Sequence, residues 1–390
     1  RVLSPGGFVR FQGVRKEFAS RLNARPASRH HLIPVPFGFD RPYWVADEHV
    51  DVEFHVRHVA LPQPGDWRQL CIQVARIHSR PLDRSKPLWE AYVIEGLHNI
   101  PGVPPGSFAL YSKMHHAIVD GESGTEIMRA LHSLSPEPID PESEEDGRDP
   151  TAIELYSRAL IHNMENVPAL ARFSFGTARR LATLGVGALG KMAAEAGAQL
   201  PSIRSILSGD LTGLLPKMPP QTRFSRDVSA HRIFEAVGLP LADFRVVRNR
   251  IPEATINDQF LAIVGGALRE YLESKNELPD ATMVAGVPLT LRGAEKGGDR
   301  GNQVGFTLMP VHTEIDDPLE RLKAISADSI KAKRMTDAIG KELARDLLDI
   351  LPNFVSGAML RNVKMPRIGL LVSNVRGPDA PLYMAGAQLV

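Results

Sequence analysis

The sequence predicts a mixed α/β protein of two halves joined by a helical linker, and three observations support this. Residues 2–134 alternate strand-like and helix-like hydrophobic patterns, and the alternation begins again after residue 225. A Pro-rich, acidic stretch and a long helical region separate these two parts. The length of 390 residues fits about two domains of ordinary size. We therefore expect a first half over residues 1–140, a linker over 141–224 and a second half over 225–390.

The elements of the first half follow from local patterns. Apolar and polar residues alternate over 50–56, which is the period of a half-buried strand. Asp66 then opens a helical stretch whose apolar side chains share one face. These side chains are Trp67, Leu70, Val74 and Ile77. Residues 89–97 and 108–114 are two further expected strands, with a Pro- and Gly-rich turn over 101–106.

The linker and the second half are read in the same way. Residues 135–149 are rich in Pro and Glu, which favours an exposed connection, and residues 151–215 have a helical pattern. The second half is expected to contain strands at 228–237, 283–291 and 305–311, a helix starting at 241–247, and helices over 257–272 and 318–332. The apolar side chains of the long helix over 257–272 are Phe260, Ile263, Val264, Ala267 and Leu268.

Charge, cysteine count and hydropathy exclude several classes of protein. The chain has 46 Lys and Arg against 45 Asp and Glu, which gives no overall attraction for nucleic acid. Its only cysteine, Cys71, cannot form an intramolecular disulfide or a Cys-rich zinc site, and we expect it inside a helix of a protein from a reducing compartment. The most apolar stretch, residues 181–198, carries Lys191 and Glu195 and falls short of the roughly 20 apolar residues of a membrane span. We expect a soluble or surface-associated protein.

The segment richest in chemistry is Ser-Lys-Met-His-His-Ala-Ile-Val-Asp-Gly over residues 112–121. Histidine has a pKa near neutrality, so it can take a proton from an alcohol and return it to a leaving group. Because consecutive strand residues point to opposite faces, only one of His115 and His116 is expected to face a substrate. The alternative is a structural histidine pair. A metal site is disfavoured, since adjacent histidines diverge and no Cys cluster supplies further ligands.

The pattern His-His-x-x-x-Asp-Gly is similar to the signature of the CoA-dependent acyltransferase superfamily. Within it, four further blocks in the expected order resemble the bacterial wax ester synthase/diacylglycerol acyltransferases. The blocks are Arg80-Pro81-Leu82-Asp83 with Lys86-Pro87-Leu88-Trp89-Glu90; Thr255-Ile256-Asn257-Asp258; Gly301-Asn302-Gln303 with Gly305; and Asn374-Val375-x-Gly377-Pro378 with Pro381-Leu382-Tyr383 and Gly386-Ala387. The family pattern also includes sequence before and after these blocks. Since the chain opens on Arg1 and closes on Val390, we expect both ends to be trimmed.

The resemblance implies roles for the residues of the first motif. His116 would be the general base that deprotonates a lipid hydroxyl, with His115 as its structural partner and without a covalent enzyme intermediate. Asp120 would pair with an arginine, for which Arg292 is our candidate, and so fix the loop. Gly121 would allow close approach of the backbone, or be a plain turn glycine.

Further residues are implied as supporting ones, each with a structural alternative. Asn257 and its neighbour Asp258 would support the site, although Asn257 also fits a helix N-cap. Asn302 and Gln303 would donate to an oxyanion or line the CoA channel, unless Gly301 and Asn302 form a simple turn. The substrate tunnel would include the side chains of a strand that equally fits the core. These are Pro87, Leu88 and Trp89.

The implied fold is two chloramphenicol-acetyltransferase-like mixed-sheet sandwich halves with an active-site tunnel between them. The implied reaction transfers a long acyl chain from acyl-CoA, a co-substrate, to diacylglycerol or a long-chain alcohol, with no tightly bound cofactor and no metal. The alternatives are a condensation-type enzyme acting on carrier-protein thioesters and a non-catalytic lipid-droplet-binding protein. We expect a cytoplasmic protein at the surface of a membrane or lipid droplet, with the helices over 155–215 either facing lipid or packed on the protein.

Overall fold

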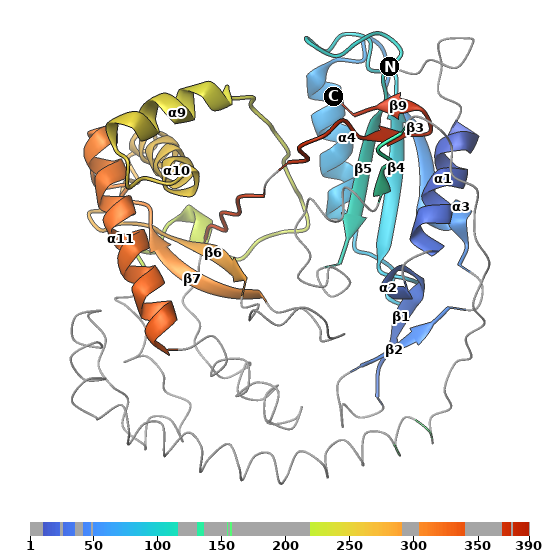
Figure 1. Cartoon of the computed structure of the whole chain (residues 1–390), viewed down its shortest axis with the longest axis horizontal. Coiled ribbons are helices and arrows are strands. Elements are labelled where there is room, and N and C mark those ends of the chain that lie inside the picture. The colour runs from blue at the N-terminus through green and yellow to red at the C-terminus, as the bar shows by residue number, and fades with distance from the viewer. Residues whose placement is uncertain are drawn as a thin grey trace.

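The computed structural model describes two layered units, which we call the first half and the second half (Figure 1). The described residues are 11–23, 26–35, 42–47, 50–115, 131–135, 154, 157, 219–290, 304–339, 369–375 and 377–389. In both units helices pack on a small β-sheet, which confirms the expected mixed α/β class. Within the described residues, no helix is both long enough and apolar enough to cross a bilayer.

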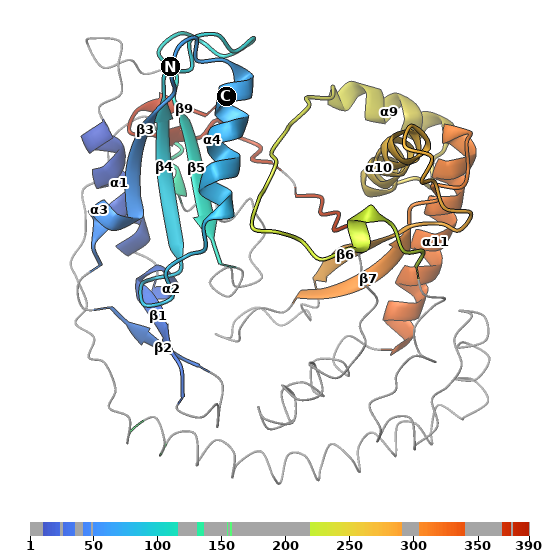
Figure 2. The same ribbon diagram turned by 180° about the vertical axis from the view of Figure 1, so that it is seen from behind.

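The first half is built on a three-stranded sheet in the order β3-β4-β5. Strand β3 (Val56–Ala60) runs parallel to β4 (Trp89–Glu95), and β5 (Ala109–Met114) runs antiparallel to β4. Helices α1 (Phe11–Asn23) and α4 (Trp67–Ser79) cover opposite faces of this sheet (Figure 2). Strand β4 is buried on both faces, because alternate side chains enter the core under α1 and the core under α4. This confirms the strands predicted over 89–97 and 108–114.

Helix α4 begins where the sequence predicts it. The Asp66 side chain accepts a hydrogen bond from the Gln69 backbone N–H at 2.8 Å, and the Gln69 side-chain oxygen accepts one from the Asp66 N–H. The predicted apolar face is confirmed, since Leu70, Val74 and Ile77 are buried. Cys71 is also buried in this helix, as expected.

The strand predicted over 50–56 is wrong for its first part. Residues Val52–His55 form the short helix α3, and β3 starts only at Val56. The cause is Asp51, whose carboxylate accepts from the backbone N–H groups of Glu53 at 3.0 Å and Phe54 at 3.1 Å. An N-cap of this kind favours a helical turn over an extended strand.

Three small elements precede this sheet in the sequence. Helix α2 (Pro26–Arg29) leads into β1 (His30–Ile33), which pairs antiparallel with β2 (Tyr43–Ala46). They lie at one end of the first half, beyond β4 (Figure 1).

The second half pairs β6 (Val284–Thr290) antiparallel with β7 (Val304–Pro310) and packs two long helices on them. Helices α10 (Ile256–Glu273) and α11 (Pro318–Ile339) confirm the predicted ones, and α9 (Leu241–Arg250) starts at its predicted residue. A 3₁₀ turn over Arg223–Ser225 precedes them. Helix α10 lies close to Val311, the residue that follows β7, because Gly265 has no side chain: a Cβ there would overlap the carbonyl oxygen of Val311.

One prediction for the second half is wrong. Residues 228–237 form no strand: the structure leaves them irregular, with a bend at Ala230, and pairs them with no strand within the described part of the chain. Of the apolar side chains of α10, Phe260 and Ile263 are exposed, at 36% and 45%. The helix turns Leu261, Ala262, Gly265 and Leu272 inward, with Val264 and Leu268 packed beside them.

The end of the chain returns to the first half. Strands β8 (Tyr383–Met384) and β9 (Ala387–Gln388) form a hairpin, and Tyr383 forms an antiparallel bridge with Ser133. Met384 belongs to the core under α1, and the Ala385 N–H donates to the buried carboxylate of Glu17. The last part of the predicted second half therefore packs on the first one, because its apolar side chains complete that core (Figure 2).

Candidate functional site

The histidine motif starts at the end of β5. The register pairs Met114 with Trp89, and the His115 backbone N–H donates to the Leu88 carbonyl at 2.9 Å. The motif is therefore fixed to the Pro-Leu-Trp block by the backbone itself. The His115 side chain is exposed.

The remaining residues of the predicted site fall into two groups. Asn257 and Asp258 lie in the second half on α10. The others lie outside the described residues and stay predictions: His116, Asp120, Gly121, Arg292, Asn302 and Gln303.

The Pro-Leu-Trp block is part of the core of the first half. Pro87, Leu88 and Trp89 are buried. The Trp89 indole N–H donates to the Ser28 carbonyl at 2.8 Å, and its ring lies 5.8 Å from that of Phe18. These contacts agree with the core alternative for this block; a tunnel-lining role stays a prediction.

His55, which the sequence reasoning missed, also contacts Trp89. The two rings stack at 4.3 Å, and His55 Nδ1 lies 2.7 Å from the Trp89 carbonyl oxygen. Because a carbonyl only accepts hydrogen bonds, Nδ1 carries the proton. Burial of this fully enclosed ring lowers the pKa of His55. The neutral His55 therefore braces the strand to which the histidine motif is attached.

The face of the sheet under α4 carries a buried polar network. The Tyr92 hydroxyl donates to the Glu90 carboxylate at 2.7 Å, and Arg57 donates to the same hydroxyl at 3.3 Å. The Arg57 guanidinium also lies 3.9 Å from Glu90. Burial, followed by the bond to Glu90, raises the pKa of Tyr92 to about 12. The carboxylate of Glu90 is thus compensated by a phenol and a cation.

The same face also fixes the end of β5 to the end of α4. Lys113 lies opposite Glu90 in the register and donates to the carbonyls of Ile77, at 3.3 Å, and Arg80. A cation suits carbonyls at the C-terminal end of a helix, and the Ile77 carbonyl also accepts from the Arg80 backbone N–H at 3.3 Å. Burial lowers the pKa of the Lys113 ammonium. The residue two positions before His115 is therefore anchored to the Arg-Pro-Leu-Asp block that follows α4.

The Asn-Asp block in the second half is a helix start. Thr255 is the N-cap of α10. Its hydroxyl accepts from the Asp258 N–H at 3.2 Å, and the Asp258 carboxylate accepts from the Thr255 N–H at 2.8 Å. Asp258 also accepts from the Ser329 hydroxyl of α11 and is only 2% exposed. The N-cap reading of Asn257 is therefore wrong: it lies in the first turn and is half-buried.

No group of His, Cys, Asp and Glu residues suited to hold a metal ion occurs in the described ranges. The described part of the candidate site consists of His115 and of the hydrogen bonds that hold its strand. A histidine at the end of a buried strand can act in proton transfer. Sequence reasoning located this strand from the motif, but it missed the buried network of His55 and Glu90.

Known proteins with similar sequences and structures identify the family. Residues 3–260 match the wax ester synthase/diacylglycerol acyltransferase catalytic domain, and residues 300–390 match the WS/DGAT C-terminal domain. In Mycobacterium tuberculosis H37Rv, a probable diacylglycerol O-acyltransferase is 33% identical over 386 residues, covering 96% of this chain and 78% of that protein. A putative diacylglycerol O-acyltransferase from the same organism is 37% identical over 394 residues, covering 98% and 79%.

A solved structure agrees with these relatives. The wax ester synthase/diacylglycerol acyltransferase from Marinobacter aquaeolei VT8 has a TM-score of 0.55 and 25% sequence identity to this chain, covering 93% of this chain and 71% of that one. Its likeness supports the fold of two mixed α/β halves. The chain therefore belongs to the wax ester synthase/diacylglycerol acyltransferase family.

Proposed function

We propose that this protein transfers a long-chain acyl group from acyl-CoA to the hydroxyl of diacylglycerol or of a long-chain alcohol. Membership of the family supports the reaction class. The observation that carries the proposal is the anchored strand end: the His115 backbone bonds to Leu88, and Lys113 bonds to the end of α4. A general base needs a fixed position relative to the hydroxyl, and these bonds hold the strand that leads into the histidine pair.

In the proposed reaction, His116 takes the proton of the acceptor hydroxyl. The oxygen attacks the thioester carbon, a carbon–oxygen bond forms and the carbon–sulfur bond breaks. The protonated imidazole then gives its proton to the departing CoA sulfur. No covalent enzyme intermediate is required, and Cys71 is not suited to form one, since burial raises the pKa of its thiol and it bonds to Glu235 at 3.8 Å.

Supporting roles are proposed for residues of both halves. Asp120, paired with Arg292, would hold the loop after the histidines, and Gly121 would let the backbone approach the substrate. Asn302 and Gln303 would donate to the oxyanion, with Asn257 nearby. Acyl-CoA enters as a co-substrate, and no tightly bound cofactor or metal takes part.

The lipid acceptor suggests where the protein works. We propose that it is cytoplasmic and contacts a membrane or lipid droplet peripherally, through arginines that flank the apolar residues of 155–215. Liposome flotation tests this with the arginines of that stretch changed to Glu. Loss of flotation is expected, and unchanged flotation would remove this surface from the proposal.

A competition assay tests the function. Labelled palmitoyl-CoA is offered hexadecanol and diacylglycerol together, and the products are separated by thin-layer chromatography. We expect labelled wax ester, triacylglycerol or both, formed without any carrier protein. A requirement for a carrier-protein thioester would support the condensation-type alternative, and lipid binding without CoA release would support the non-catalytic one.

A further inference from the structure

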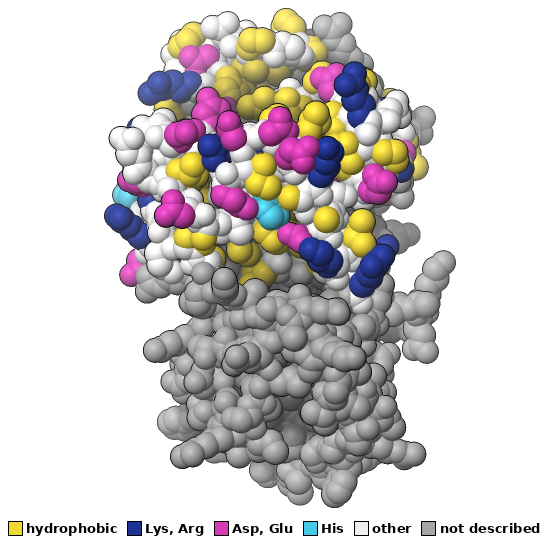
Figure 3. Space-filling view, turned by 90° about the vertical axis from the view of Figure 1, so that its left-hand side faces the viewer, with side chains coloured by type: hydrophobic (Ala, Val, Ile, Leu, Met, Phe, Trp, Pro, Cys, Tyr) yellow, Lys and Arg dark blue, Asp and Glu magenta, His cyan; other side chains and the backbone are white. Residues whose placement is uncertain are grey.

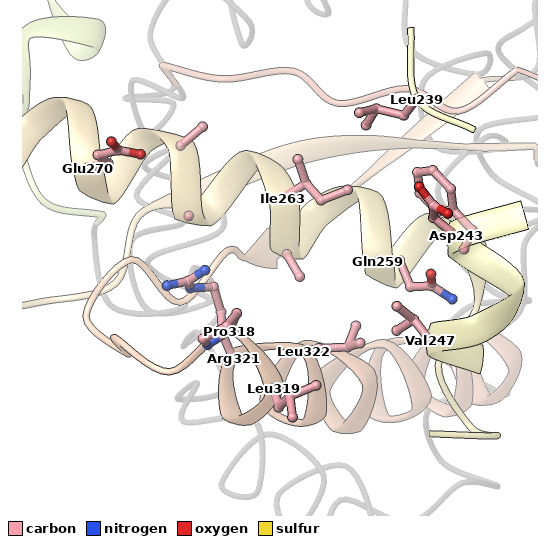
Figure 4. Close-up of a pocket in the computed structure, with 14 residues that line it drawn as sticks. Leu239, Asp243, Val247, Gln259, Ile263, Glu270, Pro318, Leu319, Arg321 and Leu322 are labelled. Atoms are coloured by element: carbon pink, nitrogen blue, oxygen red, sulfur yellow. The ribbon is translucent and has the colours of Figure 1, made fainter. Parts of the chain in front are cut away.

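A groove of about 490 Å³ lies between helices α9, α10 and α11 of the second half (Figure 4). Sites for small molecules have volumes of roughly 300–1,000 Å³ and mostly apolar walls. The apolar wall includes Leu239, Ile263 and Leu319, which are 51%, 45% and 47% exposed. All the residues that line the groove belong to the second half, and none of them is His, Ser or Cys. The groove therefore offers space for a hydrophobic molecule but no base or nucleophile that would react with it.

One cationic side chain, Arg321 of α11, forms part of the wall of this groove. It is only 5% exposed. Its Nε donates to the Ile315 carbonyl at 3.1 Å, and its Nη2 donates to the carbonyls of Ile315, at 2.8 Å, and Asp316, at 2.9 Å. Among the described residues, none of the hydrogen bonds of this guanidinium uses Nη1. The two N–H groups of Nη1 are therefore left for a molecule in the groove.

Gly266 of α10 leaves the room in which Arg321 Nη1 lies. A Cβ at this glycine would stand only 2.5 Å from Nη1. Gly266 itself lines the groove, so Nη1 lies at the groove wall. Figure 4 shows the Arg321 guanidinium reaching from α11 towards α10. Donors of a nearly buried cation that lack an acceptor are costly, and an oxygen atom of a bound molecule would remove that cost.

The charge of Arg321 is already compensated by its neighbours. Burial, and next the neighbouring Arg269, lower the pKa of Arg321. The carboxylates of Asp316, Asp317 and Glu314 act in the opposite direction and favour its charged form. The groups that Arg321 binds directly are uncharged carbonyls. A further carbonyl oxygen therefore suits Nη1 without adding an anion.

The open edge of the groove is acidic. Asp243 and Glu270 line it and are exposed, and Figure 4 places them at opposite ends of the groove. Figure 3 shows acidic side chains among apolar ones on this half. Like charges disfavour a fatty carboxylate or a phosphate head group, whereas a carboxylate accepts a hydrogen bond from a hydroxyl. The groove therefore fits an uncharged lipid that carries both a carbonyl and a hydroxyl.

We propose that this groove is a second lipid site, which binds an acylglycerol with a free hydroxyl and does not acylate it. The acyl chain lies along Ile263 and Leu319, and the ester carbonyl accepts from Arg321 Nη1. The ligand belongs to the acceptor class of the proposed function, but its binding needs neither His116 nor acyl-CoA. The inference therefore goes beyond the proposed function and can fail separately from it.

Photochemical labelling tests where the lipid binds. The probe is 1-palmitoylglycerol with a diazirine in its acyl chain, which is irradiated with the 390-residue chain, and labelled peptides are identified by mass spectrometry. We expect label on α10 and α11. Unlabelled 1-palmitoylglycerol should compete at least about tenfold better than 1-O-hexadecylglycerol, which lacks the ester carbonyl, because that carbonyl bonds to a charged group. It should also compete better than palmitate, which carries a negative charge.

Two variants alter the groove at exposed positions of α10. Ala267→Phe fills the groove, and Ile263→Asp adds a charge to its wall. Each should reduce labelling of α10 and α11 at least about tenfold. Ile330→Asp is the matched control, because Ile330 is 40% exposed on α11 and does not line the groove. It should be labelled normally. CoA release from palmitoyl-CoA should be unchanged in Ala267→Phe, and circular dichroism checks the fold of each variant.

Several results would overturn the proposal. Label confined to the first half, or equal labelling of Ala267→Phe and wild type, would show that the lipid does not occupy the groove. Equal competition by palmitate or by the ether would refute recognition of an uncharged ester. Parallel loss of label and CoA release in Ala267→Phe would make the groove part of the catalytic site. Wild-type protein that is labelled on α10 and α11 but releases no CoA would refute the proposed function alone.

Discussion

Replacing Asp258 by Ala separates a structural role from a role in the site. The sequence motif places this residue among those that support catalysis, whereas its contacts hold two helices. Its carboxylate accepts from the Thr255 N–H and hydroxyl, both at 2.8 Å, and from the Ser329 hydroxyl on α11. Removing the carboxylate leaves the Thr255 and Ser329 donors without an acceptor, at a position that is only 2% exposed.

The expected cost can be worked out from these bonds. Loss of a helix-start interaction costs about 1 kcal/mol. Loss of a hydrogen bond to a buried charged group costs about 1.5–3 kcal/mol. We therefore expect Asp258→Ala to lower the free energy of unfolding by about 3 kcal/mol. Asp258→Asn keeps one acceptor oxygen and should lose roughly half as much.

Urea unfolding followed by circular dichroism measures this difference. Asp280→Ala is the matched control, because Asp280 is exposed and its loss should change stability by less than about 0.5 kcal/mol. If Asp258→Ala unfolds at the wild-type urea concentration, the carboxylate does not hold α10 to α11 and the reasoning fails.

Three further predictions concern the packing around the histidine strand and the second half. Burial lowers the pKa of His55 in the folded protein. The free energy of unfolding of the wild type should therefore be highest above the unfolded-state pKa of about 6.5 and fall as the pH drops through that value. His55→Phe should lack this part of the pH dependence when urea midpoints are compared. Trp89→Phe removes the bond to Ser28 and should cost about 1 kcal/mol in thermal unfolding, while equal melting temperatures would dismiss that bond. Gly265→Ala should destabilise by about 1–3 kcal/mol through overlap with Val311, and a neutral effect would show that α10 can move away.

The elements that the sequence predicts well are those with a local cause. Helix α4 is specified by Asp66 and by apolar residues at helical spacing, so tertiary structure adds nothing to the prediction. The strand over 228–237 fails because a strand needs a partner as well as a pattern. The pattern of residues 50–56 misleads for the opposite reason, since the Asp51 cap outweighs the alternation there.

The residues of the candidate site also differ in whether the sequence alone reveals them. The histidine motif is visible in the sequence because its residue types and order are specific. The buried network of Glu90 and Tyr92 is not visible, since polar residues that alternate along a strand resemble a solvent face. They are buried only because α4 covers that face of the sheet. His55 is missed for the same reason: its burial depends on Trp89, which lies 34 positions further along the chain.

The most direct test of the central claim is the rate at which CoA thiol is released from palmitoyl-CoA in the presence of an acceptor. Wild-type protein, His116→Ala and His115→Ala are compared at equal concentration, with folding checked by circular dichroism. We expect His116→Ala to lose at least about 100-fold in kcat, the usual contribution of a general base, and His115→Ala to retain more activity. Near-wild-type CoA release by folded His116→Ala would contradict the assignment of His116 as the base.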